Sequence, residues 1–440
     1  MRAVGSPPIV VLDDDATGVQ TLAGIRVLLA WHADSVRAAL DGRPAVHLIT
    51  NTRALPPERV RPLVADAAWT ARQAAPDARV VLRGDSTLRG HLLEEYLGVR
   101  EVAAPGGWPV LLLVPALPAA GRVTVGGVHF FERDGVRSPL HETEYARDGV
   151  FAYRSARLLN WAEERSGGLF RAGEGRELPL EALRSGGPDA VAHALVGLAE
   201  AGRPVVFAPD AETEADLEVV AAGYEVAVDR GAAVIVRCAP TFAGVLAGTT
   251  ATAPPHAPPP ADSVLVVCGS YVPQTTRQLA CLLDDSPGAL VEADAVALAG
   301  EEADQEIYRL AGLTSRLLAA TGLAVLATPR TRSDGTASLD AGDRIAVNLA
   351  RVVAVLEPRP DVIVAKGGIT SAVTLRTGVG AHEAEVLGPV EPGVSRWGVH
   401  WPDGKLLDYL VVPGNVGDDQ LLARLVGSIA RDGNRASAVP

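Results

Sequence analysis

Short runs rich in valine, leucine and isoleucine recur along the chain, and many of them precede a stretch with helical periodicity. Such runs are typical of strands that are buried on both faces of a parallel sheet. The predicted strands span 9–14, 25–31, 45–50, 79–85, 108–117, 204–211 and 232–239 in the first half, and 263–270, 323–330 and 361–371 in the second. Helices are expected at 57–75, 90–103 and 212–229, and a hairpin around 123–137. This alternation predicts an α/β fold in which mostly parallel sheets carry helices on both faces.

Residues 248–261 interrupt the alternation. They contain five prolines and no apolar periodicity, which favours an extended backbone and prevents core packing. A chain of 440 residues also exceeds the usual size of one domain, roughly 100–200 residues. We therefore predict two domains, 1–247 and 262–440, each built on its own mostly parallel sheet and joined by this proline-rich linker.

The composition disfavours several classes of partner. With 40 basic and 53 acidic residues, the net charge of −13 disfavours nucleic-acid binding and docking on an anionic membrane. No apolar run reaches the roughly 18 residues of a membrane span, and acidic residues come too early for a signal peptide. Cys238, Cys268 and Cys281 are too few and too widely spaced for a disulfide framework or a structural zinc site. We expect a cytoplasmic protein, as a monomer or a homo-oligomer.

Three acidic residues follow the first predicted strand, in the sequence LDDDATG. In parallel sheets ligands bind at the carboxyl ends of the strands, so polar clusters there are candidate sites. Asp13, Asp14 and Asp15 repel one another and need a cation, a metal or ligand hydroxyl groups nearby. A solvated acidic turn is the equally weighted alternative. Because side chains alternate along a strand, we expect Asp13 and Asp15 to point one way and Asp14 the other.

Arginine, acid and hydroxyl groups gather after a second strand, in RGDSTLRGH. Arginine can bind a carboxylate through two parallel hydrogen bonds. A capped helix with an internal salt bridge is the alternative, but the convergence of these groups at a strand end favours function. The loops TNTR and PAAGR contribute further polar groups. Together they predict a pocket for a hydroxylated carboxylate, formed by Asn51, Arg53, Arg83, Asp85, Ser86, Thr87, Arg89 and Arg122.

The second half contains three glycine turns, CGS (268–270), KGGITSA (366–372) and PGNVG (413–417). Glycine allows backbone N–H groups to approach a phosphate closely, although each turn alone is more often an ordinary connection. The P-loop and Rossmann glycine patterns are both missing from the sequence, so a nucleotide site would be of another type. The candidate nucleotide-binding residues are Ser270, Gly367, Gly368, Ile369, Thr370, Ser371, Ala372, Gly414, Asn415 and Gly417.

Taken in order, these motifs resemble those of the four-carbon acid sugar kinases over nearly the whole chain. LDDDATG is similar to the family's D-D-x-T-G, TNTRAL to T-N-[ST]-R, RGDSTLRGH to K-x-D-S-T-x-R-G-x, and PGNVG to x-G-N-F-G. Arg83 and Val416 stand where lysine and phenylalanine are frequent. The resemblance implies phosphorylation of the terminal hydroxyl of threonate, erythronate or an oxo-tetronate. ATP and Mg²⁺ would serve as cofactors, with the acid in the N-terminal domain and the nucleotide in the C-terminal domain.

Within this interpretation Asp14 is the predicted catalytic aspartate, which would orient or deprotonate the attacking hydroxyl, with Asp85 as the second choice. Asp13 joins the predicted substrate-binding residues, and the Mg²⁺ ligands are not assigned. A non-catalytic sugar-acid sensor is the alternative, which would keep the arginine pocket without needing phosphate-binding turns. An aldolase or isomerase would require a Schiff-base lysine or metal-binding histidines. Lys366 and Lys405 are the only lysines of the sequence, and Lys366 lies at a glycine turn of the phosphate-binding type. The three intact glycine turns favour the kinase.

Overall fold

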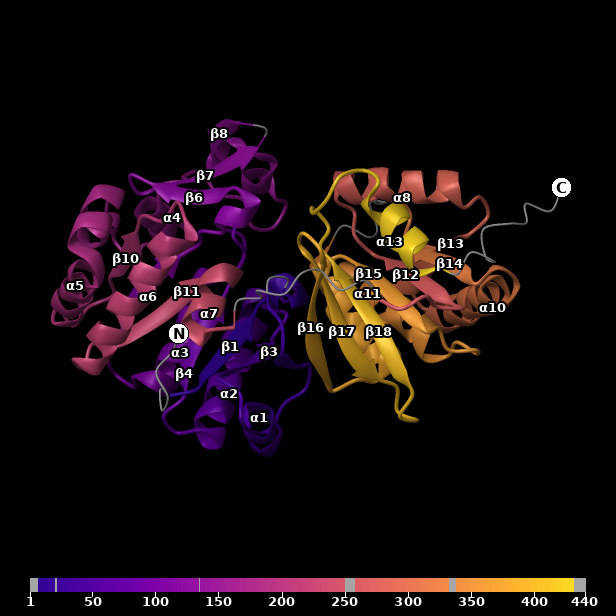
Figure 1. Ribbon diagram of the computed structural model, residues 1–440, viewed down its shortest axis with the longest axis horizontal. Coiled ribbons are helices and arrows are strands. Elements are labelled where there is room, and N and C mark those ends of the chain that lie inside the picture. Colours follow the sequence, from indigo (N-terminus) through magenta and orange to yellow (C-terminus); the bar gives the residue numbers. More distant parts are fainter. Residues whose placement is uncertain (1–6, 20–21, 134, 250–257, 332–337, 431–440) are drawn as a thin grey trace. The chain divides into compact units, whose positions relative to one another are not determined.

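The computed structural model describes residues 7–19, 22–133, 135–249, 258–331 and 338–430. The chain divides into two compact units (Figure 1). The first comprises residues 1–14 and 31–250, and the second comprises residues 15–30 and 251–440. The expected two-part α/β fold is confirmed. Residues 250–257 of the predicted linker lie outside the described residues, and the predicted domain bounds stay a prediction.

The first unit is built on a parallel sheet with the strand order β3-β1-β4-β11-β5-β10-β9. Its strands are short and rich in β-branched and leucine residues, as expected for strands covered on both faces. The strands are β1 (Ile9–Asp13), β3 (Ala45–Ile49), β4 (Arg79–Arg83), β5 (Val110–Val114), β9 (Arg176–Leu178), β10 (Val206–Pro209) and β11 (Val234–Cys238).

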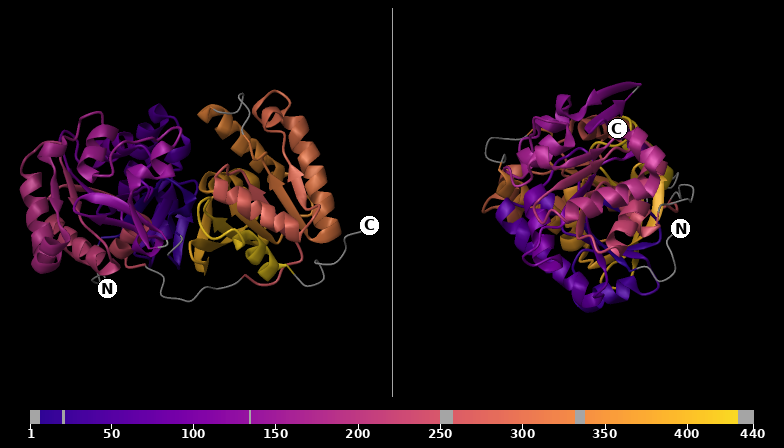
Figure 2. Two further views of the ribbon diagram at one scale, coloured as in Figure 1. Left: turned by 90° about the horizontal axis from the view of Figure 1, so that it is seen from above. Right: turned by 90° about the vertical axis from the view of Figure 1, so that its left-hand side faces the viewer.

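Helices cover both faces of this sheet (Figure 2). Ile9 and Val11 of β1 pack into one core with the helices α5 to α7. Val10 and Leu12 alternate with them and are equally buried, so the opposite face is covered too. The helices are α1 (Ala33–Leu40), α2 (Pro57–Ala74), α3 (Leu92–Ala103), α4 (Leu158–Arg165), α5 (Leu180–Ala199), α6 (Glu214–Asp229) and α7 (Pro240–Ala247).

A small antiparallel sheet follows β5 in the chain. Its strands are β6 (Arg122–Val125), β7 (Val128–Arg133) and β8 (Val136–Pro139), paired in that order. This is the hairpin expected around 123–137, extended by a third strand. It places Arg122 and Thr124 on β6, which follows β5 after the short helix η3 (Pro118–Ala120).

The second unit has the strand order β13-β14-β12-β15-β18-β17-β16-β2. The pairs from β13 to β18 are parallel, and the remaining pairs are antiparallel. The strands are β2 (Ile25–Leu28), β12 (Val264–Cys268), β13 (Leu290–Glu292), β14 (Leu323–Ala327), β15 (Val362–Lys366), β16 (Glu383–Glu391), β17 (Val394–His400) and β18 (Leu406–Val412). The helices are α8 (Pro273–Asp285), α9 (Ala295–Ala299), α10 (Ala303–Thr321), α11 (Leu339–Ala354), α12 (Gly368–Val373) and α13 (Leu421–Ile429).

An N-terminal segment, residues 15–30, groups with this second unit. Its strand β2 pairs antiparallel with β16, in a register that sets Ile25 opposite Val386. Backbone hydrogen bonds at both ends of β2 continue the pairing, from Gly24 N–H to the Val386 carbonyl (2.8 Å) and from Leu29 N–H to the His382 carbonyl (2.8 Å). The antiparallel partner of β2 is therefore a strand more than 350 residues later in the chain.

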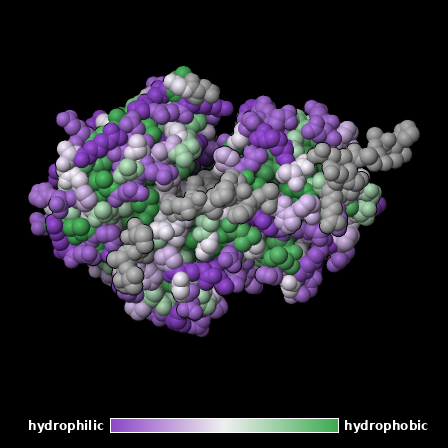
Figure 3. All heavy atoms as spheres, viewed as in Figure 1, coloured by the Kyte–Doolittle hydropathy of each residue, from purple (hydrophilic) through white to green (hydrophobic). Residues whose placement is uncertain are grey.

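No helix within the described residues is long and apolar enough to cross a membrane. Large exposed hydrophobic side chains occur singly on separate elements, for example Trp69 on α2, Val136 on β8 and Tyr308 on α10. On the face seen in Figure 3, hydrophobic side chains are interspersed with hydrophilic ones.

The packing of α5 against α6 generates a stability prediction at Gly223. A Cβ at Gly223 would overlap the Val191 side chain and lie 2.6 Å from the Pro188 carbonyl oxygen, whereas one at Gly197 of α5 would meet nothing within 4 Å. We expect Gly223→Ala to lower the free energy of unfolding by about 1–3 kcal/mol through overpacking. Gly197→Ala should instead raise it by about 0.5–1 kcal/mol through helix propensity. Urea denaturation of both variants checks this, and equal effects would contradict it.

Candidate active site

Arg83 holds two adjacent aspartates at the carboxyl end of the first sheet. The parallel register places Arg83 of β4 opposite Asp13 of β1. Its Nε lies 2.7 Å from Oδ1 of Asp13, and its Nη1 lies 2.8 Å from Oδ1 of Asp14. His47 Nδ1 lies 3.1 Å from the other oxygen of Asp13. All four side chains are almost fully buried. One guanidinium group therefore compensates two carboxylates that would otherwise repel each other strongly in the interior.

A second acid, Asp85, extends this network toward the surface. Oδ2 of Asp85 contacts Arg89 Nε at 2.7 Å and Arg53 Nη1 at 3.7 Å, and accepts a hydrogen bond from the Thr87 hydroxyl. Arg53 Nη2 also reaches Oδ1 of Asp14 at 3.2 Å. Burial alone would raise the pKa of Asp85, but Arg89, Arg53 and Thr87 outweigh it and hold that pKa well below its usual range. Asp85 is thus a permanently charged anchor for two arginines.

The expected alternation of the three aspartates is wrong. Arg83 binds both Asp13 and Asp14, whereas Asp15 belongs to the second unit. The physical reason is that β1 ends at Asp13. The two-residue period requires strand backbone angles, which the chain no longer has beyond this residue.

A second buried ion pair, which the sequence interpretation missed, supports the loop at 84–90. Arg237 of β11 binds Glu95 of α3 at 3.1 Å, and the Thr52 hydroxyl donates to the same carboxylate at 2.8 Å. A Cβ at Gly84 would lie 2.6 Å from the Arg237 guanidinium carbon, and one at Gly90 would lie 3.0 Å from its Nη2. The loop therefore rests on this guanidinium group. A charged residue inside the buried strand VIVRC was the signal that could have found it.

Three other residues predicted to bind substrate have contacts of a different kind. Asn51 adopts a left-handed backbone (φ 52°) after β3, and Arg122 lies over the Phe131 ring, 4.6 Å from its centroid. The Ser86 carbonyl lies 2.9 Å from His129 Nε2. Burial lowers the pKa of His129 to about 4, so this imidazole is neutral near pH 7 and can donate to that carbonyl. The His129 contact holds the loop backbone at Ser86, and a role of these three residues in binding substrate stays a prediction.

The glycine turns of the second unit converge at Ser270, as expected for turns that follow the neighbouring parallel strands β12, β15 and β18. A Cβ at Gly414 would lie 2.9 Å from the Ser270 hydroxyl, and one at Gly367 would lie 3.1 Å from Ser270 Cβ. A Cβ at Gly269 would lie 2.7 Å from the Thr370 hydroxyl. Glycine is required because the turns approach one another this closely.

The Lys366 side chain connects two of these turns. Its side chain is fully buried at the end of β15, and Nζ donates a 2.6 Å hydrogen bond to the carbonyl of Pro413, which begins the third turn. Burial of the ammonium group lowers the pKa of Lys366 to about 7. Lys366 thus holds the second and third turns in a fixed relation.

The remaining predicted nucleotide-binding residues divide by exposure. The Ser371 hydroxyl donates to the Gly367 carbonyl (2.8 Å) and is buried, and Ala372 is buried as well. A Cβ at Gly417 would lie 2.9 Å from Leu421 Cβ, so this glycine permits the approach of α13. Residues with more solvent access are Gly368, Ile369, Gly414, Asn415 and Gly417.

Sequence reasoning missed several side chains that support these turns. Arg330, after β14, donates from Nη1 to the Ser270 carbonyl at 2.7 Å. The Gln278 side-chain amide of α8 donates to the carbonyls of Val416 (2.9 Å) and Asp418 (2.8 Å). The Thr275 hydroxyl donates to the Gly414 carbonyl at 3.0 Å. Only the arrangement in space shows these contacts, because the turns and their supports are far apart in the chain.

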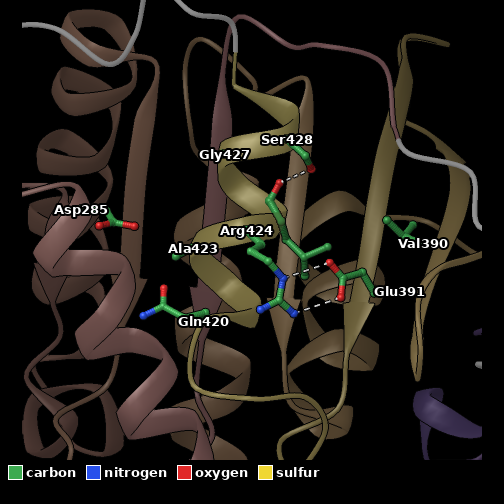
Figure 4. Close-up of a pocket in the computed structure, with 9 residues that line it drawn as sticks. Asp285, Val390, Glu391, Gln420, Ala423, Arg424, Gly427 and Ser428 are labelled. Carbon is green, nitrogen blue, oxygen red and sulfur yellow. Dashed lines mark hydrogen bonds and ion pairs between the residues drawn. The ribbon is translucent and has the colours of Figure 1, made fainter.

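A surface pocket lies elsewhere in the second unit, between α8, the end of β16 and α13 (Figure 4). Arg424 spans it and binds both oxygens of Glu391, at 3.1 Å and 3.4 Å. None of the predicted site residues lines it.

Two domain families match the sequence, one described as "Sugar-binding N-terminal domain" over residues 9–246 and one as "Nucleotide-binding C-terminal domain" over residues 265–422. The chain is 29% identical over 285 residues to D-erythronate kinase of Heliobacterium modesticaldum, covering 62% of this chain and 59% of that protein. It is 26% identical over 336 residues to D-threonate kinase of Salmonella typhimurium, covering 74% and 73%. The first of these matches spans less than two thirds of the relative's length.

The fold has a close counterpart among solved structures. A protein from Salmonella typhimurium LT2 described as a tRNA synthase superposes with a TM-score of 0.64 at 20% identity, covering 96% of this chain and 98% of that chain. This likeness concerns the fold alone. The family matches define a two-domain α/β protein with a sugar-binding and a nucleotide-binding part. The chain belongs to the four-carbon acid sugar kinase family, which confirms the resemblance found in its motifs.

The buried network predicts that Arg83 is needed for folding. Arg83→Ala leaves Asp13 and Asp14 buried without this cation, and we expect a loss of about 3–5 kcal/mol in the free energy of unfolding. Arg26→Ala is the matched control, because Arg26 pairs with Glu383 at 3.3 Å on the surface and such pairs contribute about 0–1 kcal/mol. Denaturant unfolding measures both, and similar losses would contradict the assignment.

The low pKa of Lys366 predicts a pH dependence of stability. Lys366 titrates at about 7 in the folded protein, against 10.5 as its ordinary value. Between these values the unfolded chain binds the extra proton, so stability rises with pH. From pH 7 to 9, the free energy of unfolding of the wild type relative to Lys366→Met should increase by up to about 1.4 kcal/mol per pH unit. Urea denaturation of both proteins at pH 6 to 9 tests this. A difference in the free energy of unfolding that does not change with pH would contradict the prediction.

Proposed function

We propose that this protein is an ATP-dependent kinase that phosphorylates the terminal hydroxyl of a four-carbon sugar acid. The observation that carries the proposal is the coexistence of two clusters in one chain. The first unit holds arginines and aspartates at the carboxyl ends of its strands, and the second holds converging glycine turns. The family's D-erythronate and D-threonate kinases support threonate, erythronate or an oxo-tetronate as the substrate.

In this proposal Arg89 and Arg53 bind the substrate carboxylate. They are the more exposed arginines of the network, at 21% and 13%, whereas Arg83 is fully committed to Asp13 and Asp14. A carboxylate ligand would share their guanidinium groups with Asp85, which can hold both arginines in place before the ligand arrives. Such preorganisation reduces the entropy lost on binding.

The nucleotide would bind at the glycine turns. Their backbone N–H groups can approach phosphate oxygens where side chains would block the way, and the Ser270 and Thr370 hydroxyls line the same turns. Mg²⁺ is the expected companion of ATP, and these oxygen donors suit a hard cation. When bound, it would neutralise charge on the phosphates during transfer.

Asp14 is the proposed group that orients or deprotonates the attacking hydroxyl. Asp85 stays the second choice, because Arg89 and Arg53, the arginines proposed to bind the substrate carboxylate, are the ones that it holds. Arg83 Nη1 and Arg53 Nη2 contact Oδ1 of Asp14 and hold that carboxylate in place. Phosphoryl transfer depends on positioning more than on strong base catalysis, so a firmly held carboxylate is suitable.

The decisive experiment measures ADP release from ATP with a panel of erythronates, threonates and oxo-tetronates. A kinase releases ADP with one or a few of them and transfers phosphate to the acid. A non-catalytic sensor would bind an acid, as seen by calorimetry, without releasing ADP. No turnover and no acid binding across the panel would reject the proposal.

The assignment of Asp14 predicts a split between kcat and nucleotide binding. We expect Asp14→Asn to lower kcat by about 10²–10⁴-fold, the usual contribution of a general base, while ADP binding is kept. Asp85→Asn is the comparison variant and should chiefly raise KM for the acid, because Arg89 and Arg53 lose the carboxylate that holds them in place. If Asp85→Asn removes kcat and Asp14→Asn does not, the base is Asp85.

A further inference from the structure

Asp15 is the one member of the acidic triplet that lies in the second unit, and it is outside the predicted site residues. It precedes the short helix η1 (Ala16–Val19), which packs against α12 and β18. The Thr17 N–H donates to Oδ1 of Asp15 at 2.7 Å, which fixes the orientation of the carboxylate. The side chain is only 8% exposed.

The Asp15 carboxylate lies directly on the glycine pair of the second turn. A Cβ at Gly368 would overlap both carboxylate oxygens, so no other residue than glycine fits there while Asp15 keeps its position. At the preceding residue, a Cβ at Gly367 would lie 3.4 Å from the Thr370 hydroxyl and 3.8 Å from the Ser270 hydroxyl. One carboxylate and two hydroxyls therefore surround two consecutive glycines.

We propose that Asp15 binds the Mg²⁺ ion that accompanies the nucleotide at these turns. The inference rests on the proposed kinase function and assigns the metal site that the motifs left open. A carboxylate beside a phosphate-binding turn would by itself repel the phosphates, and a divalent cation between them turns the repulsion into attraction. The Ser270 and Thr370 hydroxyls add oxygen donors of the kind that Mg²⁺ prefers.

The number of protein ligands agrees with this assignment. Mg²⁺ in phosphate-transferring enzymes is bound by one or two carboxylates together with substrate phosphates and water. Within the described residues, no group of three or more His, Cys, Asp or Glu side chains could hold a metal ion alone. The site that Asp15 provides would therefore bind the ion together with the nucleotide. Asp13 and Asp14 are instead bound by Arg83.

The test compares ADP affinity with Mg²⁺ and with EDTA, by isothermal titration calorimetry on the full chain. For the wild type we expect tighter binding with Mg²⁺. In Asp15→Asn this gain should fall by about tenfold or more, in the range known for weakened metal sites. Metal-free ADP should bind Asp15→Asn at least as tightly as the wild type, because a negative charge is removed. Electron paramagnetic resonance of Mn²⁺ with ADP gives a second readout that does not depend on activity.

Two controls separate the possible outcomes. Asp419→Asn removes a surface carboxylate of the same unit, paired with Arg277 at 2.9 Å, and should keep the full Mg²⁺ gain. If Asp15→Asn does not fold, Gly368→Ala displaces the carboxylate instead and should lose the gain. A full gain in Asp15→Asn, or no gain in a wild type that binds ADP, overturns the metal assignment alone. A wild type that binds no ADP under either condition overturns the proposed function itself.

Discussion

The guanidinium group of Arg83 lies between two carboxylates that adjoin in the chain, and the first unit is arranged around that contact. Two buried aspartates side by side are unstable unless a cation compensates them, and a long, planar cation can contact both. The parallel register supplies it, because β4 ends opposite β1. Arg53 and Arg89 pair with Asp14 and Asp85 and are more exposed than Arg83. An anionic substrate can compete with Asp85 for these two arginines.

Both candidate sites use glycine to allow close approach. In the first unit, Gly84 and Gly90 let the loop at 84–90 rest on the Arg237 guanidinium group. In the second unit, Gly367 and Gly414 let the second and third turns approach Ser270 of the first. In each case a buried basic side chain, Arg237 or Lys366, supports the backbone of a loop or turn and is itself held by an acceptor, Glu95 or the Pro413 carbonyl. Polar backbone is thereby kept rigid at the strand ends, as a preorganised site requires.

Much of the fold follows from local patterns, because buried strands and amphipathic helices leave a periodic record in the sequence. The strands β1, β4, β12 and β15 and the motifs at their carboxyl ends were predictable for this reason. The pairing of β2 with β16 was not, because no local pattern records a partner more than 350 residues away. The Glu95–Arg237 pair was hidden for a related reason: each residue alone looks like an ordinary charge in a helix or a strand, and only burial of both shows their importance.

The acidic triplet shows how far such patterns reach. A two-residue period predicts side chains only while the backbone remains a strand, and β1 ends at the first aspartate. Beyond the strand, tertiary contacts determine where each side chain lies. Arg83 binds Asp13 and Asp14, whereas residues 15–30 belong to the second unit, where Asp15 lies on Gly368. Three identical residues thus have different environments: two lie next to the same buried cation and one lies on a glycine turn. Residues of one type that adjoin in the sequence can therefore have different roles. The neighbours of each carboxylate are the physical basis for assigning those roles.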